Sequence, residues 1–552
     1  MTTSTSNAPP PLAHPGDAPD TTKGATTTET AAVTPLPEPG RPAAAATSSA
    51  RTRQPPEQHT LASRFLVLIL CLAVILSTLA FGTVQSWALA FFQAGACLVV
   101  LLWTLDAWRT RRLRLSRNLL QLPLVGLFLV GLVQLLPLGG AGEAGGAAGV
   151  GGLTNAPVNT LTLDPYSTRF ALIQLGSLIV YFCATLVFTD SPARLRLFVR
   201  VITIFGFLLA LFGMFQYFTN PSQIYWFRQP RFAMPFGPFI NRHHFAAYME
   251  LTLALPLGLL VSGAVAVERR LLYIFAAAIM GLALILTSSR GGILSLGAEV
   301  LFLAAIAGLV RRKDKREAEE NTEAAAESRV RAALVRVGIG FALVVALLAG
   351  SVYLGGEESL SRLFGTVNAD DPTSGRVQFW QGTWEVIKHH PLIGAGLGAF
   401  SVAYTRYDVL NGASRLEQAH NDYLQILADA GIIGGLLGLV FLYALFRYGF
   451  ARLNSKDKFR RGVAAGALAG CFAVLVHSFF EFSLHMTSNA LLFLVLAALA
   501  TLDGRVEDPA ASKGRRSRRK RRSSSSASEA ARPPQQVAQG RNEVLTGGGG
   551  GV

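Results

Sequence analysis

The sequence carries little charge for its length, and acidic residues are the scarcer sign. Of its 552 residues 15% are charged, and Asp+Glu 34 stand against Lys+Arg 50, a surplus of +16. Disordered chains are rich in charge and poor in apolar residues, whereas 51% of this chain is hydrophobic. Nucleic-acid binders are basic but not this apolar, so no nucleic-acid partner is expected. The combination is typical of a multi-span membrane protein with basic loops.

Cysteine is also scarce. Its four copies, Cys71, Cys97, Cys183 and Cys471, lie in apolar runs with no second Cys or His at ligand spacing. The sequence therefore predicts neither a disulfide framework nor a zinc site, and these side chains read as small apolar membrane residues.

The two ends lack large apolar residues. Residues 1–60 are mostly Thr, Ser, Ala and Pro, and residues 504–552 contain Gly514-Arg-Arg-Ser-Arg-Arg-Lys-Arg-Arg522, a serine run and a glycine run. Such segments cannot bury enough surface to offset their chain entropy. We expect two disordered tails around a transmembrane domain over residues 61–503. The basic block favours a cytoplasmic tail near anionic lipid over an RNA-binding patch.

Between the tails, apolar runs of about 17–25 residues recur, the length that crosses roughly 30 Å of hydrocarbon. They predict an all-α polytopic membrane protein. About twelve runs are present, near 64–82, 86–105, 119–138, 169–189, 197–219, 244–266, 270–288, 291–310, 333–354, 431–448, 462–482 and 486–503.

The charge pattern predicts an orientation. With both termini cytoplasmic and the spans alternating, the basic loops fall inside, as the positive-inside rule requires. The long outside segment 355–430 then holds five basic and nine acidic residues. Seven of the nine histidines also lie on or near this outer face. We therefore expect polar chemistry to be concentrated on the outer side of the membrane, which in a bacterium is the periplasmic side.

The outside segment is too long and too patterned for a connector. Residues 375–388 have helical apolar spacing and predict an amphipathic interfacial helix, anchored by Trp380 and Trp384. Arg376, at its start, is less easily explained as an anchor. The glycine-rich stretch 389–400 lacks the Lys-Ser/Thr of a phosphate loop, so it predicts a turn where backbone approaches backbone or ligand.

A histidine stands at the entrance to the tenth span. Asn421 is a plausible N-cap with Asp422 in the first turn. His420 then precedes a helix N-terminus, whose partial positive charge favours the neutral, proton-accepting imidazole. A general base fits this position, and a structural histidine fits it too.

Three further stretches concentrate polar residues on the outer side. The stretch 228–245 is dense in Arg, His and aromatics, and Arg290 lies in a tight turn between two spans. An arginine at that depth needs a partner, either another helix or a phosphate, which suits its planar fork. His477, Glu481 and His485 have i, i+4, i+8 spacing, which predicts one helical face and favours a hydrogen-bonded cluster over a metal site.

These motifs together resemble the O-antigen ligase/polymerase family over about residues 60–503. His420-Asn421, nine residues and Gly431-Ile-Ile-Gly434 match its His-Asn-x9-Gly-x-x-Gly pattern. Ligases often carry Thr after the second Gly, and Gly435 stands here, which favours a polymerase slightly. The supporting segments are Arg376 with Trp380, His390-Pro-Leu-Ile-Gly-Ala-Gly396, Ser289-Arg-Gly-Gly292, Asn241-Arg-His-His-Phe-Ala246 and His477 with Glu481.

The resemblance implies a metal-independent glycosyltransferase without cofactors. Such enzymes pass a glycan from an undecaprenyl-diphosphate carrier to a hydroxyl of a glycan, lipid A-core or another acceptor, in O-antigen or exopolysaccharide assembly. His420 would be the base, and Arg290 and Arg376 would stabilise the leaving diphosphate. The expected substrate-binding residues are Arg231, Arg242, Asn241, His243, Asn421, Tyr423, His477 and Glu481.

A transporter or flippase of lipid-linked glycan is the alternative. Twelve spans with both ends inside also describe major-facilitator carriers, whose main inside loop follows the sixth span. Here the charged inside loop 311–332 follows the eighth predicted span. The sequence therefore favours chemistry at the outer surface over transport.

The orientation can be tested directly. A topology reporter fused near residue 410 should read periplasmic and one near residue 320 cytoplasmic, because the basic loops stay inside. The reverse pattern would move His420 away from the lipid-carrier side.

Overall fold

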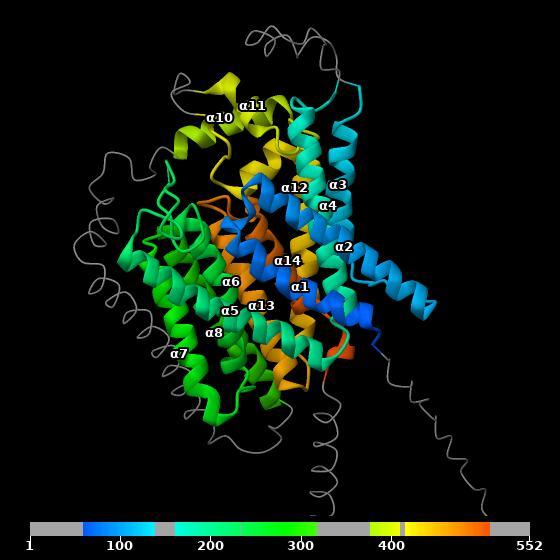
Figure 1. Ribbon diagram of the computed structural model, residues 1–552, viewed down its shortest axis with the longest axis vertical. Helices are drawn as coiled ribbons and strands as arrows, with labels where there is room; N and C mark the ends of the chain where they lie inside the picture. The colour runs from blue at the N-terminus through cyan, green and yellow to red at the C-terminus, as the bar shows by residue number, and fades with distance from the viewer. Residues whose placement is uncertain (1–58, 139–159, 232, 317–375, 409–414, 508–552) are drawn as a thin grey trace, which may run out of the picture. The chain divides into compact units, whose positions relative to one another are not determined.

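The computed structural model describes residues 59–138, 160–231, 233–316, 376–408 and 415–507. Within these ranges the regular elements are helices, and no strand is assigned (Figure 1). The first six α-helices are α1 (Leu61–Leu79), α2 (Ser86–Thr110), α3 (Gln121–Gln134), α4 (Pro165–Phe188), α5 (Pro192–Thr219) and α6 (Arg242–Val261). The others are α7 (Val267–Leu286), α8 (Arg290–Arg316), α10 (Arg376–His389), α11 (Phe400–Tyr404), α12 (Asp422–Arg452), α13 (Lys458–His477) and α14 (Thr487–Thr501).

Nine of the described helices are long and apolar enough to cross a membrane, and α3 and α14 are shorter apolar helices. The all-helical membrane class is thus confirmed. The predicted span 333–354, the loop residues 355–375 and nearly all of both predicted tails lie outside the described residues, so a total of twelve spans stays a prediction. Large apolar side chains such as Phe91 and Leu271, 75% and 77% exposed, form the lipid-facing surface of such a protein.

Several of these helices begin at residues that satisfy free backbone N–H groups. Asp164 and Ser191 cap α4 and α5, and each is followed by a proline, which fits the first turn of a helix because that turn needs no N–H. Asn241 caps α6 in the same way. These caps fix where the spans start.

Helices α6 and α13 form the buried centre (Figure 1). Gly462, Gly466 and Gly470 recur every four residues on α13 and lie against Gly258 and neighbouring small residues of α6. A Cβ on Gly466 would lie 2.4 Å from the backbone oxygen of Ala254. The two backbones are therefore in contact, which positions the ends of both helices.

Helix α10 occupies the stretch predicted to be an amphipathic helix. Its buried side is made by Thr383, Val386 and Ile387, and Val377 and Trp384 are 42% and 52% exposed. The exposed Trp384 fits the predicted interfacial anchor. The helix turns its Thr383 side inward because Gly382 there lies against Tyr404 of α11.

The glycine-rich segment after α10 brings backbone against backbone, as predicted. Gly431 interrupts α12 with φ 64 and ψ −163. At this kink, the N–H groups of Ile432 and Ile433 bond to the carbonyls of Pro391 and Leu392 at 2.8 and 3.2 Å. A Cβ on Gly431 would come within 2.4 Å of Leu392. This close approach is possible only for glycine and fixes the direction of the short helical part, Asp422–Ala430.

We predict that Gly466→Ala lowers the free energy of unfolding by about 1–3 kcal/mol, because the methyl group forces the α6 and α13 backbones apart. The measurement is thermal unfolding in detergent. The matched control is Gly297→Ala on α8, where a Cβ meets no atom within 4 Å. An equal loss of stability in both variants would contradict the proposed contact.

Candidate active site

Three arginines meet at one small pocket. Arg242, Arg290 and Arg376 are the first residues of α6, α8 and α10, and all three line a cavity of about 170 Å³. The other lining residues are His243, Ser288, Gly291, His477, Phe480 and Glu481. Elements far apart in the sequence thus contribute three guanidinium groups to one site.

The helix starts add to the positive potential. The N-terminus of a helix carries partial positive charge on its free N–H groups and favours anions. At α6, the Asn241 side chain accepts from His243 N at 2.9 Å, and His243 Nδ1 lies 2.8 Å from Ser289 Oγ just before α8. These contacts hold two of the helix starts together. The planar fork of arginine matches phosphate oxygens, so the pocket is suited to a phosphate or diphosphate.

Glu481 is the buried acid of this pocket. Its side chain is 2% exposed and accepts from Arg376 at 3.0 Å through Oε2, and His420 Nδ1 lies 2.7 Å from Oε1. Burial by itself raises the pKa of Glu481, but the hydrogen bond from His420 and the electrostatic interaction with the nearby histidines outweigh it. The pKa of Glu481 therefore lies well below its usual range. An ionised carboxylate accepts from both partners.

His420 is held in an unusual conformation. Its φ of 49 lies in the left-handed region, which is uncommon outside glycine and clusters at functional sites. Asn421 fixes the next residue: it caps α12 by accepting from Tyr423 N and Leu424 N, as predicted, and donates to Phe479 O at 3.1 Å. Because Glu481 takes Nδ1–H, the lone pair of the neutral imidazole lies on Nε2, the nitrogen a base would use.

The predicted helical face of His477, Glu481 and His485 was wrong. Helix α13 ends at His477, and Asp422 helps turn the following chain by accepting from Ser478 Oγ and Leu484 N at 2.7 and 3.1 Å. The three side chains therefore have three different partners: Glu250, the Arg376–His420 pair, and Asp422. No group of three or more His, Cys, Asp or Glu among the described residues is arranged for a metal, and metal independence stays a prediction.

Four of the predicted binding residues do not line the arginine pocket, and two of these, Asn241 and Asn421, cap α6 and α12 instead. Arg231 is exposed and does not line the arginine pocket. Tyr423 points its hydroxyl to the carbonyl of Leu475 at 2.7 Å and lines a second cavity. Arg242, Arg290, Arg376, His243, His477 and Glu481 share the pocket, with His420 bonded to its acid.

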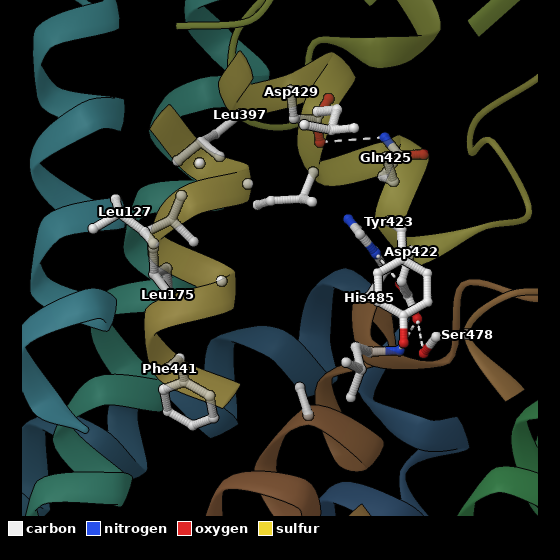
Figure 2. Close-up of a pocket in the computed structure, with 18 of the residues that line it drawn as sticks. Leu127, Leu175, Leu397, Asp422, Tyr423, Gln425, Asp429, Phe441, Ser478 and His485 are labelled. Carbon is white, nitrogen blue, oxygen red and sulfur yellow. Dashed lines mark hydrogen bonds and ion pairs between the residues drawn. The ribbon is translucent and has the colours of Figure 1, made fainter. Parts of the chain in front are cut away.

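The second cavity is large and apolar, with a volume of about 690 Å³, within the range of ligand sites. Its walls come from α3, α4, α12 and α14, including Leu127, Leu175 and Phe441 (Figure 2). Its polar end is acidic and holds Asp422, Asp429, Gln425, Ser478 and His485 (Figure 2). No Lys or Arg is among the described residues that line it. A hydrocarbon chain fits its walls, and sugar hydroxyls fit its carboxylates.

Sequence reasoning missed the acids of the second cavity and Glu250, the partner of His477. Asp429 Oδ1 is buried and has no hydrogen-bond partner among the described residues. Glu250 lies inside an expected span, and an acid there is costly enough to indicate function. That signal was present in the sequence, but the partner on α13 was not.

Fold and site define a polytopic membrane protein with an arginine-lined pocket beside a histidine–carboxylate pair. The protein-family model described as O-antigen ligase matches residues 275–439. This match supports the predicted assignment to the O-antigen ligase/polymerase family and a role in polysaccharide assembly. The matched range includes Arg290, Arg376 and His420. No curated protein matches the chain.

We predict that Arg290→Ala weakens binding of inorganic diphosphate to the purified protein about tenfold or more, since it removes a charge-assisted hydrogen-bond donor. Arg231→Ala is the matched control, because Arg231 lies outside the pocket. Calorimetric titration measures both. A comparable loss of diphosphate affinity in Arg231→Ala would show that Arg231 also contributes to binding, which would contradict the prediction.

Proposed function

We propose that the protein transfers a glycan from an undecaprenyl-diphosphate carrier to an acceptor hydroxyl at the periplasmic face of the bacterial inner membrane. The observation that carries the proposal is one pocket with three helix-start arginines and the Glu481–His420 pair on its edge. The arginines can stabilise the charge of a diphosphate. The Glu481–His420 pair can take the proton of an acceptor hydroxyl.

In this mechanism the carrier diphosphate lies among Arg242, Arg290 and Arg376. The acceptor O–H gives its proton to Nε2 of His420 while its oxygen attacks the anomeric carbon. The bond from that carbon to the phosphate oxygen breaks, and the electron pair stays on the diphosphate, where the arginines stabilise it. Direct displacement inverts the anomeric configuration. Glu481 holds the imidazole and stabilises the imidazolium that forms.

The apolar cavity supports the proposal that the substrate is lipid-linked. Its walls suit a hydrocarbon chain, and the carboxylates of Asp422 and Asp429 at its polar end suit hydrogen bonds from sugar hydroxyls rather than a diphosphate. Ser478 and His485 of this cavity flank Glu481 in the sequence. A hydroxyl-bearing headgroup in the cavity would therefore lie close to the base.

A polymerase and a ligase use the same chemistry on different acceptors. Gly435, where ligases often have Thr, favours a polymerase of an exported polysaccharide. Surface-glycan analysis of a deletion strain separates the two, since single repeats on lipid A indicate a lost polymerase and full chains left on the carrier indicate a lost ligase.

We predict that His420→Ala lowers glycan transfer about 100-fold or more, because a positioned general base contributes about 10²–10⁴. The assay is transfer from a lipid-diphosphate donor by purified protein, with His389→Ala as control, an exposed histidine on α10. Equal glycan transfer by His420→Ala and the wild-type protein would contradict the assignment of His420 as the general base. Movement of lipid-linked glycan across vesicles without a new bond would favour the flippase.

A further inference from the structure

A buried histidine–carboxylate pair lies on the inner side of the arginine pocket. Glu250 of α6 and His477, the last residue of α13, are 0% and 1% exposed, and His477 Nδ1 lies 2.8 Å from Glu250 Oε1. A carboxyl inside a membrane helix is expensive and is retained where it has a partner and a task. The pair is distinct from Glu481–His420, which comes from residues outside the spans.

The ring of His477 reaches from this pair into the pocket. His477 Nδ1 is hydrogen-bonded to Glu250, and His477 lines the pocket together with Arg290 and Arg242. The opposite edge of the ring faces the first turn of α8, where a Cβ on Gly291 would lie 2.9 Å from Cδ2 and 3.1 Å from Nε2. The absence of a side chain at Gly291 leaves Nε2 beside the helix start that is suited to a phosphate.

Two histidines thus share one arrangement around one pocket. In each, Nδ1 bonds to a buried carboxylate, which leaves Nε2 for a substrate. A reaction that takes a proton from an acceptor hydroxyl and leaves charge on a phosphate oxygen needs one base and benefits from one acid. His420, 28% exposed, is open to an acceptor, whereas the buried His477 adjoins the arginines.

We propose that His477 donates a proton to the leaving diphosphate and that Glu250 is its positioning residue, a role that rests on the proposed function. The imidazolium of His477, paired with the Glu250 carboxylate, gives its Nε2 proton to the phosphate oxygen as the bond to the anomeric carbon breaks. That oxygen keeps the electron pair, and Nδ1 keeps its hydrogen. His420 gains the proton that the acceptor loses, and both histidines return to their starting states by exchange with solvent.

The test is the pH dependence of kcat. The base His420 must be neutral, so activity rises with pH on the acidic limb, and the acid His477 must be protonated, so activity falls on the basic limb. Glu250→Gln should lower kcat about 100-fold without raising KM for the donor, and His477→Gln should abolish the basic limb. The charged and titratable groups around the His477–Glu250 pair that shape this limb are Glu299 beside Glu250, and Glu481, Asp422, His243, His244, Arg242, Arg290 and Arg376 around His477.

Glu385→Gln on α10 is the control. Glu385 is bonded to Lys388 at 2.7 Å and does not line the arginine pocket. This variant should therefore keep the wild-type pH profile. Affinity for inorganic diphosphate and the thermal midpoint are measured for each variant, so that a folding defect is seen as such. If Glu250→Gln does not fold, His477→Gln at the pocket edge carries the test.

The inference would be overturned by an unchanged kcat in Glu250→Gln or by a basic limb that remains in His477→Gln. Glycan transfer by the wild-type protein would in that case still support the proposed function. A loss confined to KM or to diphosphate affinity would make His477 a binding residue and also overturn it. No glycan transfer by the wild-type protein would instead reject the proposed function.

Discussion

The candidate site depends on one buried carboxylate that is bonded to both an arginine and a histidine. Glu481 bonds to Arg376 at the start of α10 and to His420 before α12, so it joins the arginine that we propose for the phosphate to the histidine that we propose as the base. Removing one partner of a buried ion pair leaves an uncompensated charge, so loss of Arg376 would destabilise the buried Glu481 carboxylate. The same carboxylate offsets part of the charge of three arginines, which eases the crowding of cations at three helix starts.

Much of the fold could be predicted from local sequence. The apolar runs predicted most of the spans, because length and hydropathy decide whether a helix can cross a membrane. Asn421 predicted the start of α12, because helix capping depends on local sequence. The glycine-rich stretch predicted a close approach of backbone. Its partner at Gly431 could not be predicted, because it lies about forty residues away and no periodicity relates the two segments.

The site was predicted less completely, for the same reason. His477, Glu481 and His485 were assigned to one face from their spacing, but Asp422 turns the chain after α13, and that contact is tertiary. Residue type identified the arginines and His420 as chemical groups, whereas the convergence of Arg242, Arg290 and Arg376 depends on how α6, α8 and α10 pack. The Glu250–His477 pair was missed because it joins two helices far apart in the chain.

The backbone pairing at the Gly431 kink has a consequence for variation. The segment beginning at Pro391 is fastened to α12 by N–H and carbonyl groups, which every residue type supplies apart from the missing N–H of proline. Side chains such as Leu392, 67% exposed, can therefore change without releasing the attachment. The surface of this segment can therefore vary in sequence while the backbone attachment to α12, and with it the position of His420 at the start of α12, stays the same.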